Sequence, residues 1–569
     1  MKINRRDFIK TSSFFAMCFT VSGASTFLKW IKEKPTAFAA NSVTGIKKVP
    51  VQIKDFDRVG QALLKLRYAG KIPDKLQVNV VNKKGTILAE GTPIKPTTPA
   101  FLHKVQKVDD KVVDLVLSLS PEMIAGNQMY IDIRDQGNGF RFLSGSVVVE
   151  KTPQQIVNNQ PIEGYTSRVS YAPGETIELK VHSTQARFSV DFIRYGEKEH
   201  VVSKVKNIPG KRQNYPLYAY RNGAGWDSSY RFKVPEDWKS GLYAARLYDQ
   251  LENEFYVSFL ISRIDKNIPK QQRIAVLSST NTWAAYNTWG GASLYQYFYE
   301  EDIRPAYAQM VSTERPNPAA SPMGNPEHLA NAEKLILGWL EKNHYPYSVI
   351  SDWDLDQNPD LLDSFGTLII NTHGEYWTES MYDALERFLN RGGNLLTLSG
   401  NAIYWKTVLK KDKPEVRKKF GYHLLNGERG GLWFNLDRSE SYVLGVRYTP
   451  EGYMTFHPYR VEKADHWVFK GTNLKNGDLI GERGLNRGGA SGHETDKMDK
   501  FTPKNAVLLA KGTNPDKGGA EMVYYDHHGG GGVFSVGSIS FGGSLVIDER
   551  LSRIVKNVLN HFTKRDINQ

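Results

Sequence analysis

The chain of 569 residues has a single cysteine, Cys18, and it lies among the first 40 residues. The chain beyond that segment therefore has no disulfide, no thiolate metal site and no cysteine nucleophile. The apolar run over 14–28 is short for a membrane-spanning helix. The glycine pairs at 290–291 and 392–393 form neither a P-loop nor a GxGxxG pattern, so we expect turns there and no phosphate cradle.

The sequence also lacks any dense run of lysine and arginine, although its formal net charge is +13. Residues 1–39 hold seven Lys or Arg and two Asp or Glu, so this segment contributes 7 − 2 = +5 of that charge. The remainder is a mildly basic surface, which favours solubility or attraction to anionic surfaces. We expect no nucleic-acid partner, because such partners require a clustered basic footprint.

The N-terminal segment 1–40 has the features of an export signal. "NRRDFIK" is followed by the apolar run over 14–28 and by the small residues "TAFAA", the order of a basic, an apolar and a cleavage region. The Arg5-Arg6 pair resembles the twin-arginine type, which predicts a periplasmic, extracellular or cell-surface protein cut near Ala39 or Ala40. The alternatives are an ordinary secretory signal with a chance arginine pair and an uncleaved membrane anchor.

Two segments after the signal, 41–152 and 153–265, consist of short strands separated by turn residues. "LQVNVVNKKGTILAEGTP" gives two strands around a Lys-Lys-Gly turn, and "TSRVSYAPGETIELKVHS" repeats this style further along the chain. Regularly spaced short strands of this kind are typical of β-sandwiches. We therefore predict two N-terminal β-sandwich-like modules.

The segment 266–569 changes to alternating strands and helices. "RIAVLSST", "FGTLIINTH" and "NLLTLSGN" are apolar strands, and "EHLANAEKLILGWLEKN" has apolar residues at helical spacing. "TESMYDALERFLNRGG" is a second helix, in which Thr378 suits the N-cap and Gly392 the stop. This alternation predicts a parallel α/β sheet, completed by a hairpin, a loop and a closing helix after residue 520.

Polar side chains gather where these apolar strands end. His373, Glu375 and Tyr376 follow one strand, and Asn401 and Tyr404 follow the next. Ligands of open α/β sheets bind outside the carboxyl ends of the strands, so these corners form a candidate reaction site. Taken alone, the corners favour the other interpretation, in which large rim residues pack and point their polar tips at water.

The order of several aromatic and glycine motifs resembles one family. The motifs are "STNTWAAYNTWGGASLY", "THGEYWTESMYDALERFLNRGGNLLTLSGNAIYW", "ADHWVFKGTNL" and "GGGVFSVGSISFGGSL". Together they resemble the large subunit of N,N-dimethylformamidase, over roughly residues 155–563. The resemblance implies a C-terminal fold like glutamine amidotransferases without the cysteine. It also implies a mononuclear iron held by two tyrosines and a glutamate, with hydrolysis of a small N-substituted amide and a separate small subunit.

The iron that the resemblance implies is expected to be ferric. Hard anionic oxygen donors suit such a hard cation, and a strong nearby cation is what a phenolate needs near neutral pH. The residues that match the family's ligands are Tyr376, Tyr404 and Glu494. The sequence leaves rivals open, namely Tyr286 or Tyr422 in place of Tyr404, and Glu428 or Glu482 in place of Glu494.

Three further residues receive expected catalytic roles on chemical grounds, given such a metal site. His373 is expected to orient the site or carry a proton to the leaving amine, Glu375 to hold that imidazole, and Asn401 to donate to a developing oxyanion. The packing alternatives are a satisfied histidine at a strand end and an ordinary turn asparagine. A stretch of three aromatic residues and an asparagine is expected either to line a substrate pocket or to pack against the β-modules. Its members are Trp283, Tyr286, Asn287 and Trp289.

The sequence therefore predicts an exported, metal-dependent hydrolase of an amide C–N bond. The alternative is a non-catalytic exported binding or surface protein that retains the fold. A redox use of the iron is the weaker third hypothesis, since no electron-transfer ligands are evident. The expected partners are a small amide substrate, a small subunit or a second copy of the chain, and the cell surface.

Overall fold

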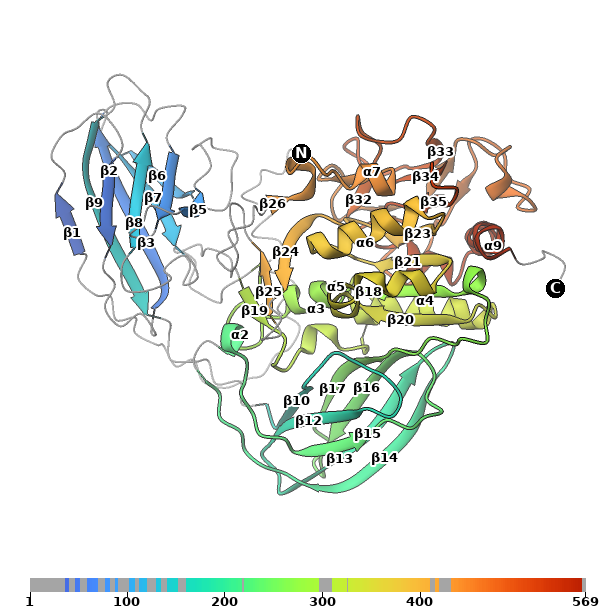
Figure 1. The fold of residues 1–569 in the computed structure, drawn as a ribbon, viewed down its shortest axis with the longest axis horizontal. Coiled ribbons are helices and arrows are strands. Elements are labelled where there is room, and N and C mark those ends of the chain that lie inside the picture. The colour runs from blue at the N-terminus through green and yellow to red at the C-terminus, as the bar shows by residue number, and fades with distance from the viewer. Residues whose placement is uncertain are drawn as a thin grey trace.

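The computed structural model describes residues 160–216, 219–295, 310–324, 326–409 and 431–564, together with the backbone of the strands between 36 and 151 and of 415–418. Of the export signal predicted over 1–40, residues 1–35 and 40 lie outside these residues, and Thr36–Ala39 of its predicted cleavage region form a strand. The described chain is rich in β-sheet, contains helices mainly in its C-terminal half, and is divided into several sheets (Figure 1). None of the described helices combines the length and apolarity needed to cross a bilayer.

The strands between residues 36 and 151 form two antiparallel sheets, of order β1-β9-β3-β7-β6 and β2-β8-β4-β5. The predicted Lys-Lys-Gly hairpin is confirmed, because β4 and β5 pair antiparallel. The strand bounds are β1 Thr36–Ala39, β2 Lys47–Val51, β3 Val59–Ala69, β4 Gln77–Val81, β5 Ile87–Glu90, β6 Leu102–Lys107, β7 Val112–Leu119, β8 Met129–Arg134 and β9 Arg141–Lys151.

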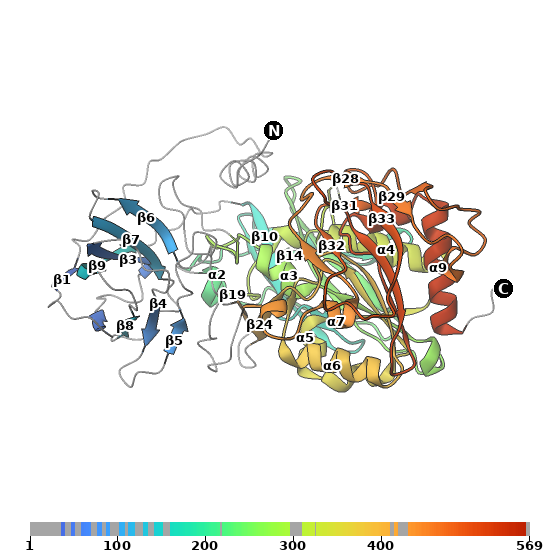
Figure 2. The same cartoon turned by 90° about the horizontal axis from the view of Figure 1, so that it is seen from above.

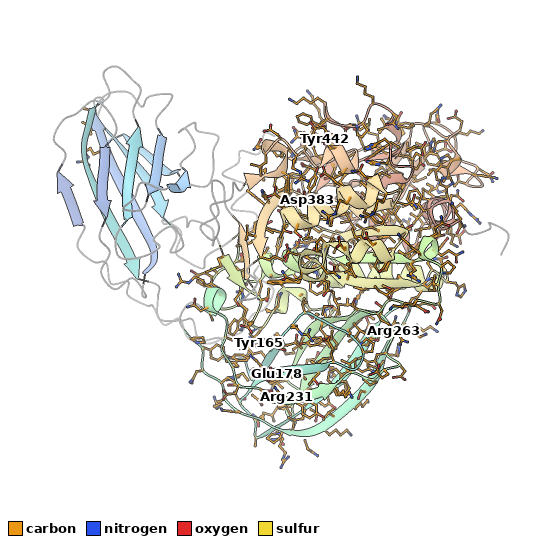
Figure 3. All side chains as sticks on the ribbon, in the orientation of Figure 1. Tyr165, Glu178, Arg231, Arg263, Asp383 and Tyr442 are labelled. Carbon is orange, nitrogen blue, oxygen red and sulfur yellow. The ribbon has the colours of Figure 1, made fainter. Side chains whose placement is uncertain are left out.

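The next segment forms a three-stranded sheet, β10-β12-β15, and a five-stranded sheet, β11-β17-β16-β13-β14. Alternate residues of β12, Ile177, Leu179 and Val181, are fully buried, as expected for a strand with one face on a core. The cross-strand pair Glu178–Arg231 lies on the other face (Figure 3). The bounds are β10 Ile162–Thr166, β11 Ser170–Tyr171, β12 Thr176–Ser183, β13 Arg187–Tyr195, β14 Glu199–Pro209, β15 Tyr230–Lys233, β16 Gly241–Tyr248 and β17 Glu254–Ile261, with helix α2 at Ala219–Asn222.

A nine-stranded sheet of order β20-β18-β21-β23-β35-β34-β33-β29-β30 organises the C-terminal half. Its first five strands pair parallel, which confirms the predicted parallel sheet, and the β34–β35 hairpin is antiparallel as predicted. The bounds are β18 Ile274–Ser278, β20 Tyr347–Ser351, β21 Thr367–Thr372, β23 Asn394–Ser399, β29 Tyr459–Val461, β30 Leu479–Ile480, β33 Val507–Gly512, β34 Glu521–Asp526 and β35 Gly532–Ser535.

Both faces of the parallel strands are buried under helices (Figure 2). In β18, Ile274 and Val276 pack with α4 (Ala330–Lys342) and α9 (Glu549–Thr563), whereas Ala275 and Leu277 pack with α6 (Glu379–Asn390). Successive strand residues point to opposite faces, so a sheet covered on both sides requires apolar residues throughout its strands. This requirement explains the unbroken apolar runs in the sequence.

Helix α6 begins and ends where its sequence predicts. The Thr378 side chain accepts a hydrogen bond from the Met381 amide as the N-cap, and Gly392 adopts a φ of 83° just after the last turn. The apolar side of the helix, Met381, Leu385, Phe388 and Leu389, is buried against the sheet. The remaining helices are α3 Thr280–Tyr286, α5 Asp352–Gln357, α7 Ser441–Leu444 and α8 Phe541–Leu545.

Smaller strands complete the rim of the large sheet. β22 (Tyr376–Trp377) pairs parallel with β24 (Trp405–Leu409), so the two predicted Tyr-Trp corners lie side by side. The glycine-rich segment 488–500 contains two short strands, β31 and β32, which pair with β28 and β27. The remaining bounds are β19 Met310–Ser312, β25 Glu415–Lys418, β26 Gly431–Leu432, β27 Arg447–Thr449, β28 Phe456–His457, β31 Ser491–Gly492 and β32 Thr495–Lys497.

A buried carboxyl group joins the second β-module to the α/β part. Glu163 of β10 accepts hydrogen bonds from the Tyr215 hydroxyl and, at 2.8 Å, from the Trp289 indole. Burial raises the pKa of Glu163 to about 7, and the two hydrogen bonds oppose part of that rise. The folded chain therefore keeps a proton that the unfolded chain releases near pH 4.5.

We expect Glu163 to make stability fall as pH rises. Because its pKa is raised by folding, its contribution is complete below about pH 4.5 and is lost as pH rises through about 7. Glu163→Gln, which cannot ionise, should remove about 3 kcal/mol of this pH dependence between pH 4.5 and 8. Thermal unfolding followed across this range measures the difference. The surface variant Glu254→Gln is the control, and an unchanged pH slope in Glu163→Gln would contradict the expectation.

Candidate functional site

Strained backbone gathers where β21 and β23 end. Thr372, Asn401 and His493 have φ values of 59°, 50° and 65°. Residues other than glycine rarely adopt this left-handed backbone conformation. Such strain persists where the surrounding structure fixes it, and it clusters at functional sites. Gly400 completes the corner, because a Cβ there would lie 2.7 Å from the Glu494 carbonyl oxygen. The corner after β23 can therefore approach the segment of Glu494 only with glycine at position 400.

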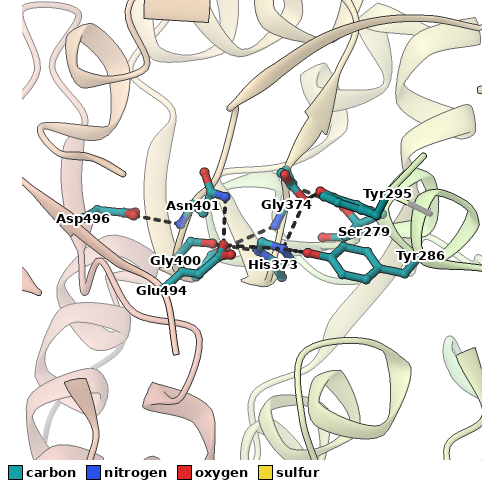
Figure 4. Close-up of polar contacts among 12 residues, drawn as sticks. Ser279, Tyr286, Tyr295, His373, Gly374, Gly400, Asn401, Glu494 and Asp496 are labelled. Atoms are coloured by element: carbon teal, nitrogen blue, oxygen red, sulfur yellow. Dashed lines mark hydrogen bonds and ion pairs between the residues drawn. The ribbon is translucent and has the colours of Figure 1, made fainter. Parts of the chain in front are cut away.

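His373 is the centre of the polar contacts at these corners (Figure 4). Its side chain is fully buried, and Nδ1 donates a hydrogen bond to the Gly400 carbonyl at 3.0 Å. Its other nitrogen, Nε2, lies 3.2 Å from Glu375 Oε2, 3.8 Å from Glu494 Oε2 and 3.4 Å from the Tyr286 hydroxyl. Two carboxylates and a phenol from three separate segments thus face one imidazole nitrogen.

The two carboxylates govern the ionisation of this centre. Burial by itself lowers the pKa of His373, but the hydrogen bond to Glu375 and the charges of Glu494 and Glu375 outweigh it and hold that pKa at about 9. Burial raises the pKa of Glu494 to about 7, against the attraction of His373. The centre therefore stores a proton near neutral pH, shared among an imidazole and carboxylates.

Asn401 fixes the far side of Glu494. Its side-chain amide donates to Glu494 Oε2 at 2.8 Å, and its backbone N–H donates to Asp496 Oδ1 at 2.8 Å. Among the described residues, Asn401 Oδ1 and Asp496 Oδ2 are buried and have no hydrogen-bond partner. Buried polar atoms of this kind are rare in native proteins and commonly indicate a ligand site.

Two tyrosines from the stretch after β18 point into the same centre (Figure 4). The Tyr295 hydroxyl donates to Glu375 Oε2, and the Tyr286 and Tyr295 ring centroids lie 4.4 Å apart. Burial and then the charge of Glu375 raise the pKa of both phenols well above 10. Both phenols therefore stay protonated at neutral pH unless a cation offsets the nearby negative charge.

The predicted ligands Tyr376 and Tyr404 lie beside this group, and the Tyr376 side chain is hydrogen-bonded to that of Tyr295. Tyr376 is buried and its ring centroid is 6.3 Å from that of Tyr295, while the Tyr404 ring contacts Trp405, Phe434 and Tyr448. Burial raises the pKa of both phenols, and the charges of Glu375 and Glu494 add to the rise. The structure thus gathers the predicted site residues, and their roles stay predictions.

The predicted pocket residues lie in different places. Tyr286 reaches His373, whereas Trp283 donates to Glu333 Oε1 at 2.8 Å and Asn287 donates to the Pro316 carbonyl at 2.9 Å. Trp289 buries against Tyr215 and Trp226 of the second β-module, the alternative that the sequence left open. Of the rival ligands, Glu482 is exposed, and Tyr422 and Glu428 lie outside the described residues.

The sequence alone indicated no role for Tyr295, Asp496 or His328. The structure places all three at or beside the centre. Tyr295 is the last residue of the motif "STNTWAAYNTWGGASLY", so the motif contained the signal. His328 lies in a loop without a motif, and only its ring contacts with Tyr286 and His373 reveal its position.

Buried Arg315 fixes the loop that carries both tyrosines. Its guanidinium donates to the carbonyls of Ser312, Ala284, Asn287, Trp289 and Ala292, and the side chain is 1% exposed. Four of these carbonyls belong to the end of α3 and the turn between α3 and Tyr295, and that of Ser312 belongs to β19. The conformation of that turn, and with it the direction of both phenols, therefore depends on one side chain.

We expect Arg315→Met to lower stability by at least about 3 kcal/mol, since it leaves several buried carbonyls without a donor. It should also lower the activity of the site, because the loop carrying Tyr286 and Tyr295 loses its anchor. Thermal or urea unfolding measures the first effect. Arg231→Met, which breaks only the exposed pair with Glu178, is the matched control and should change stability by less than about 0.5 kcal/mol. An equal effect of the two variants would contradict the expectation.

The donor set of the centre suits a hard cation. Within the described residues, no group of three or more His, Cys, Asp or Glu is arranged to hold a metal ion. A cation here would therefore need the phenol oxygens of the tyrosines in addition to the carboxylates. Carboxylate and phenolate oxygens are hard donors, and a cation would offset the negative charge that raises the pKa of the phenols. The residues present thus fit the iron that the sequence resemblance implies.

The fold and this tyrosine–carboxylate centre define a class of protein, an α/β domain with a buried oxygen-rich site at the carboxyl edge of its sheet. Residues 189–555 match the family model described as N,N-dimethylformamidase beta subunit-like, C-terminal. This match covers more than half of the chain. The chain therefore belongs to that family, and the resemblance seen in the sequence is confirmed.

Two relatives show how similar this sequence is to other members of the family. The N,N-dimethylformamidase beta subunits of Alcaligenes sp and Paracoccus aminophilus are each 28% identical to this chain, over 60% of it and 54% of their own length. The chain thus spans about half the length of these curated relatives. Among solved structures, the mmIFT52 N-terminal domain aligns with 40% of this chain at 15% identity and a TM-score of 0.21, too low to carry an argument.

Proposed function

We propose that this chain hydrolyses the C–N bond of a small amide. The observation that carries the proposal is the convergence of Tyr286, Tyr295, Glu375, Glu494 and His373 on one buried point at the carboxyl edge of the sheet. The names of the relatives support the same reaction, since both are called subunits of N,N-dimethylformamidase.

We infer that the centre holds iron. The sequence resemblance assigns the ligands Tyr376, Tyr404 and Glu494. The contacts favour a different set, Tyr286, Tyr295 and Glu375, because the Tyr295 hydroxyl already meets Glu375 Oε2 and the two phenol rings lie side by side. When bound, such a metal polarises a carbonyl and acidifies water.

The remaining residues of the centre would transfer the proton during hydrolysis. Hydrolysis adds hydroxide from water to the carbonyl carbon, breaks the C–N bond and delivers a proton to the departing amine. His373 Nε2, which carries a proton near neutral pH and lies between Glu375 and Glu494, is placed to give that proton to the departing nitrogen. Glu494 beside it is placed to accept the proton of the attacking water and return it to His373. Asn401 holds Glu494 in position through its side-chain amide.

The direct test is metal content and turnover of the full chain. Purified protein should contain about one iron per chain, and it should release amine and carboxylate from a panel of small amides that includes N,N-dimethylformamide. Removal of the iron by a chelator should abolish turnover, and readdition should restore it. Iron-free protein that still hydrolyses amides would refute the metal, and iron-loaded protein inert on every amide, with and without a small subunit, would refute the hydrolase.

Three wider predictions belong to the same proposal. We propose that residues 1–40 are a twin-arginine signal that exports the folded chain, and that the two N-terminal modules are β-sandwich-like. We also propose that the C-terminal part has a fold like glutamine amidotransferases. Because the relatives are named beta subunits, a separate small subunit or a second copy is the expected partner.

A further inference from the structure

His328 is a largely buried imidazole beside the centre, and among the described residues its ring nitrogens have no hydrogen-bond partner. Its ring centroid lies 4.5 Å from that of Tyr286, 5.0 Å from His493 and 5.7 Å from His373. The side chain is 15% exposed, but both ring nitrogens are buried and neither has a hydrogen-bond partner among the described residues. The Glu327 carboxylate, at 4.0 Å, is beyond hydrogen-bond distance.

The hydrogen bonding of His328 contrasts with that of His373. Both nitrogens of His373 face protein groups, the Gly400 carbonyl on one side and Glu375 with Glu494 on the other. A buried donor or acceptor left without a partner costs about 1–3 kcal/mol. A cost of this size next to a candidate reaction centre is expected where a ligand supplies the missing partner.

The chemistry of that partner follows from the imidazole. In every protonation state an imidazole carries at least one N–H, so His328 always offers a donor. The strongest acceptor of an uncharged amide is its carbonyl oxygen. Aromatic rings surround His328, namely those of Tyr286 and His493, with Tyr453 and Phe456 packed around His493. A hydrogen bond that these rings shield from water is stronger than one in water.

We propose that His328 donates a hydrogen bond to the carbonyl oxygen of the amide bound at this centre, and so binds and orients the substrate. The inference rests on the proposed hydrolase function and adds a substrate-binding residue to it. A site built to hydrogen-bond a substrate group discriminates strongly when that pairing is lost.

The experiment compares His328→Phe with His328→Gln in the full chain. Phenylalanine keeps a ring against Tyr286 and removes both nitrogens, whereas glutamine restores a donor. We expect His328→Phe to keep wild-type iron content and melting temperature, and to lower kcat/KM about 10- to 100-fold. His328→Gln should recover at least part of that loss. Calorimetric titration with N,N-dimethylformamide and acetamide should show weaker binding by His328→Phe, independently of turnover.

Equal kcat/KM and equal amide affinity in His328→Phe and the wild type would overturn the proposal. Loss of iron or of melting temperature shared by both variants would also overturn it, in favour of a structural role. A wild type that neither binds nor hydrolyses any amide would instead refute the proposed function, so the two failures are distinguishable. His561→Phe, whose ring stacks on Trp467 away from the centre, is the control and should match the wild type.

Discussion

Tyr286→Phe and Tyr295→Phe should each remove most of the iron and its phenolate charge-transfer band. Both hydroxyls are buried in the group that contains Glu375, so losing either removes an oxygen donor from the proposed ligand set. Activity should fall by more than the roughly 10–100-fold that loss of an outer partner of a metal site causes. Iron analysis, the visible spectrum and kcat/KM measure the three effects.

The sequence-derived ligands give the comparison for this prediction. Tyr376→Phe and Tyr404→Phe should keep the band and lose at most roughly 10–100-fold in activity, if these residues only surround the metal. Tyr382→Phe, whose hydroxyl donates to the Ser439 carbonyl away from the centre, should leave the spectrum unchanged. Loss of the band in Tyr376→Phe and Tyr404→Phe, with retention in Tyr286→Phe and Tyr295→Phe, would restore the ligand set inferred from the sequence.

His373→Gln should lower kcat by roughly 10²–10⁴-fold with iron content retained. The imidazole is placed to move a proton between water and the leaving amine, and proton transfer by a positioned side chain contributes about that factor. It is not among the oxygen donors, so the metal should stay bound. The measurements are steady-state kinetics and iron analysis on the same preparation.

Added imidazole distinguishes proton transfer from a structural effect of this variant. Partial recovery of kcat by exogenous imidazole would support a proton-transfer role. A kcat within threefold of the wild type would contradict the role, and so would loss of iron in proportion to the loss of activity. Asp496→Asn serves as a comparison and should lower kcat less than His373→Gln. Among the described contacts, Asp496 is hydrogen-bonded to the centre through the backbone N–H of Asn401.

Much of the local structure could be predicted because it depends on short-range rules. The N-cap at Thr378 and the stop at Gly392 follow from side-chain and backbone geometry within one turn. The parallel sheet followed from apolar strands alternating with amphipathic helices. The corners at His373 and Asn401 could be selected because sheets of this kind bind ligands at one edge.

The partners within the site could not be predicted in the same way. Glu494 lies more than a hundred residues after His373, and its approach to Asn401 depends on Gly400, on short strands that the sequence did not reveal and on the pairing of distant segments. The direction of Tyr286 and Tyr295 depends on Arg315, which has no motif of its own.

The sequence by itself determined the parallel sheet, the family and the strand ends at which chemistry would gather, because periodicity, caps and ordered motifs are written along the chain. Only the tertiary structure decided which oxygens share one buried point, that His373 faces two carboxylates, and that His328 stands beside them with no hydrogen-bond partner in the part of the chain that the structure describes. Those facts depend on distances between segments far apart in sequence and on the exclusion of water, and neither is encoded in local residue order.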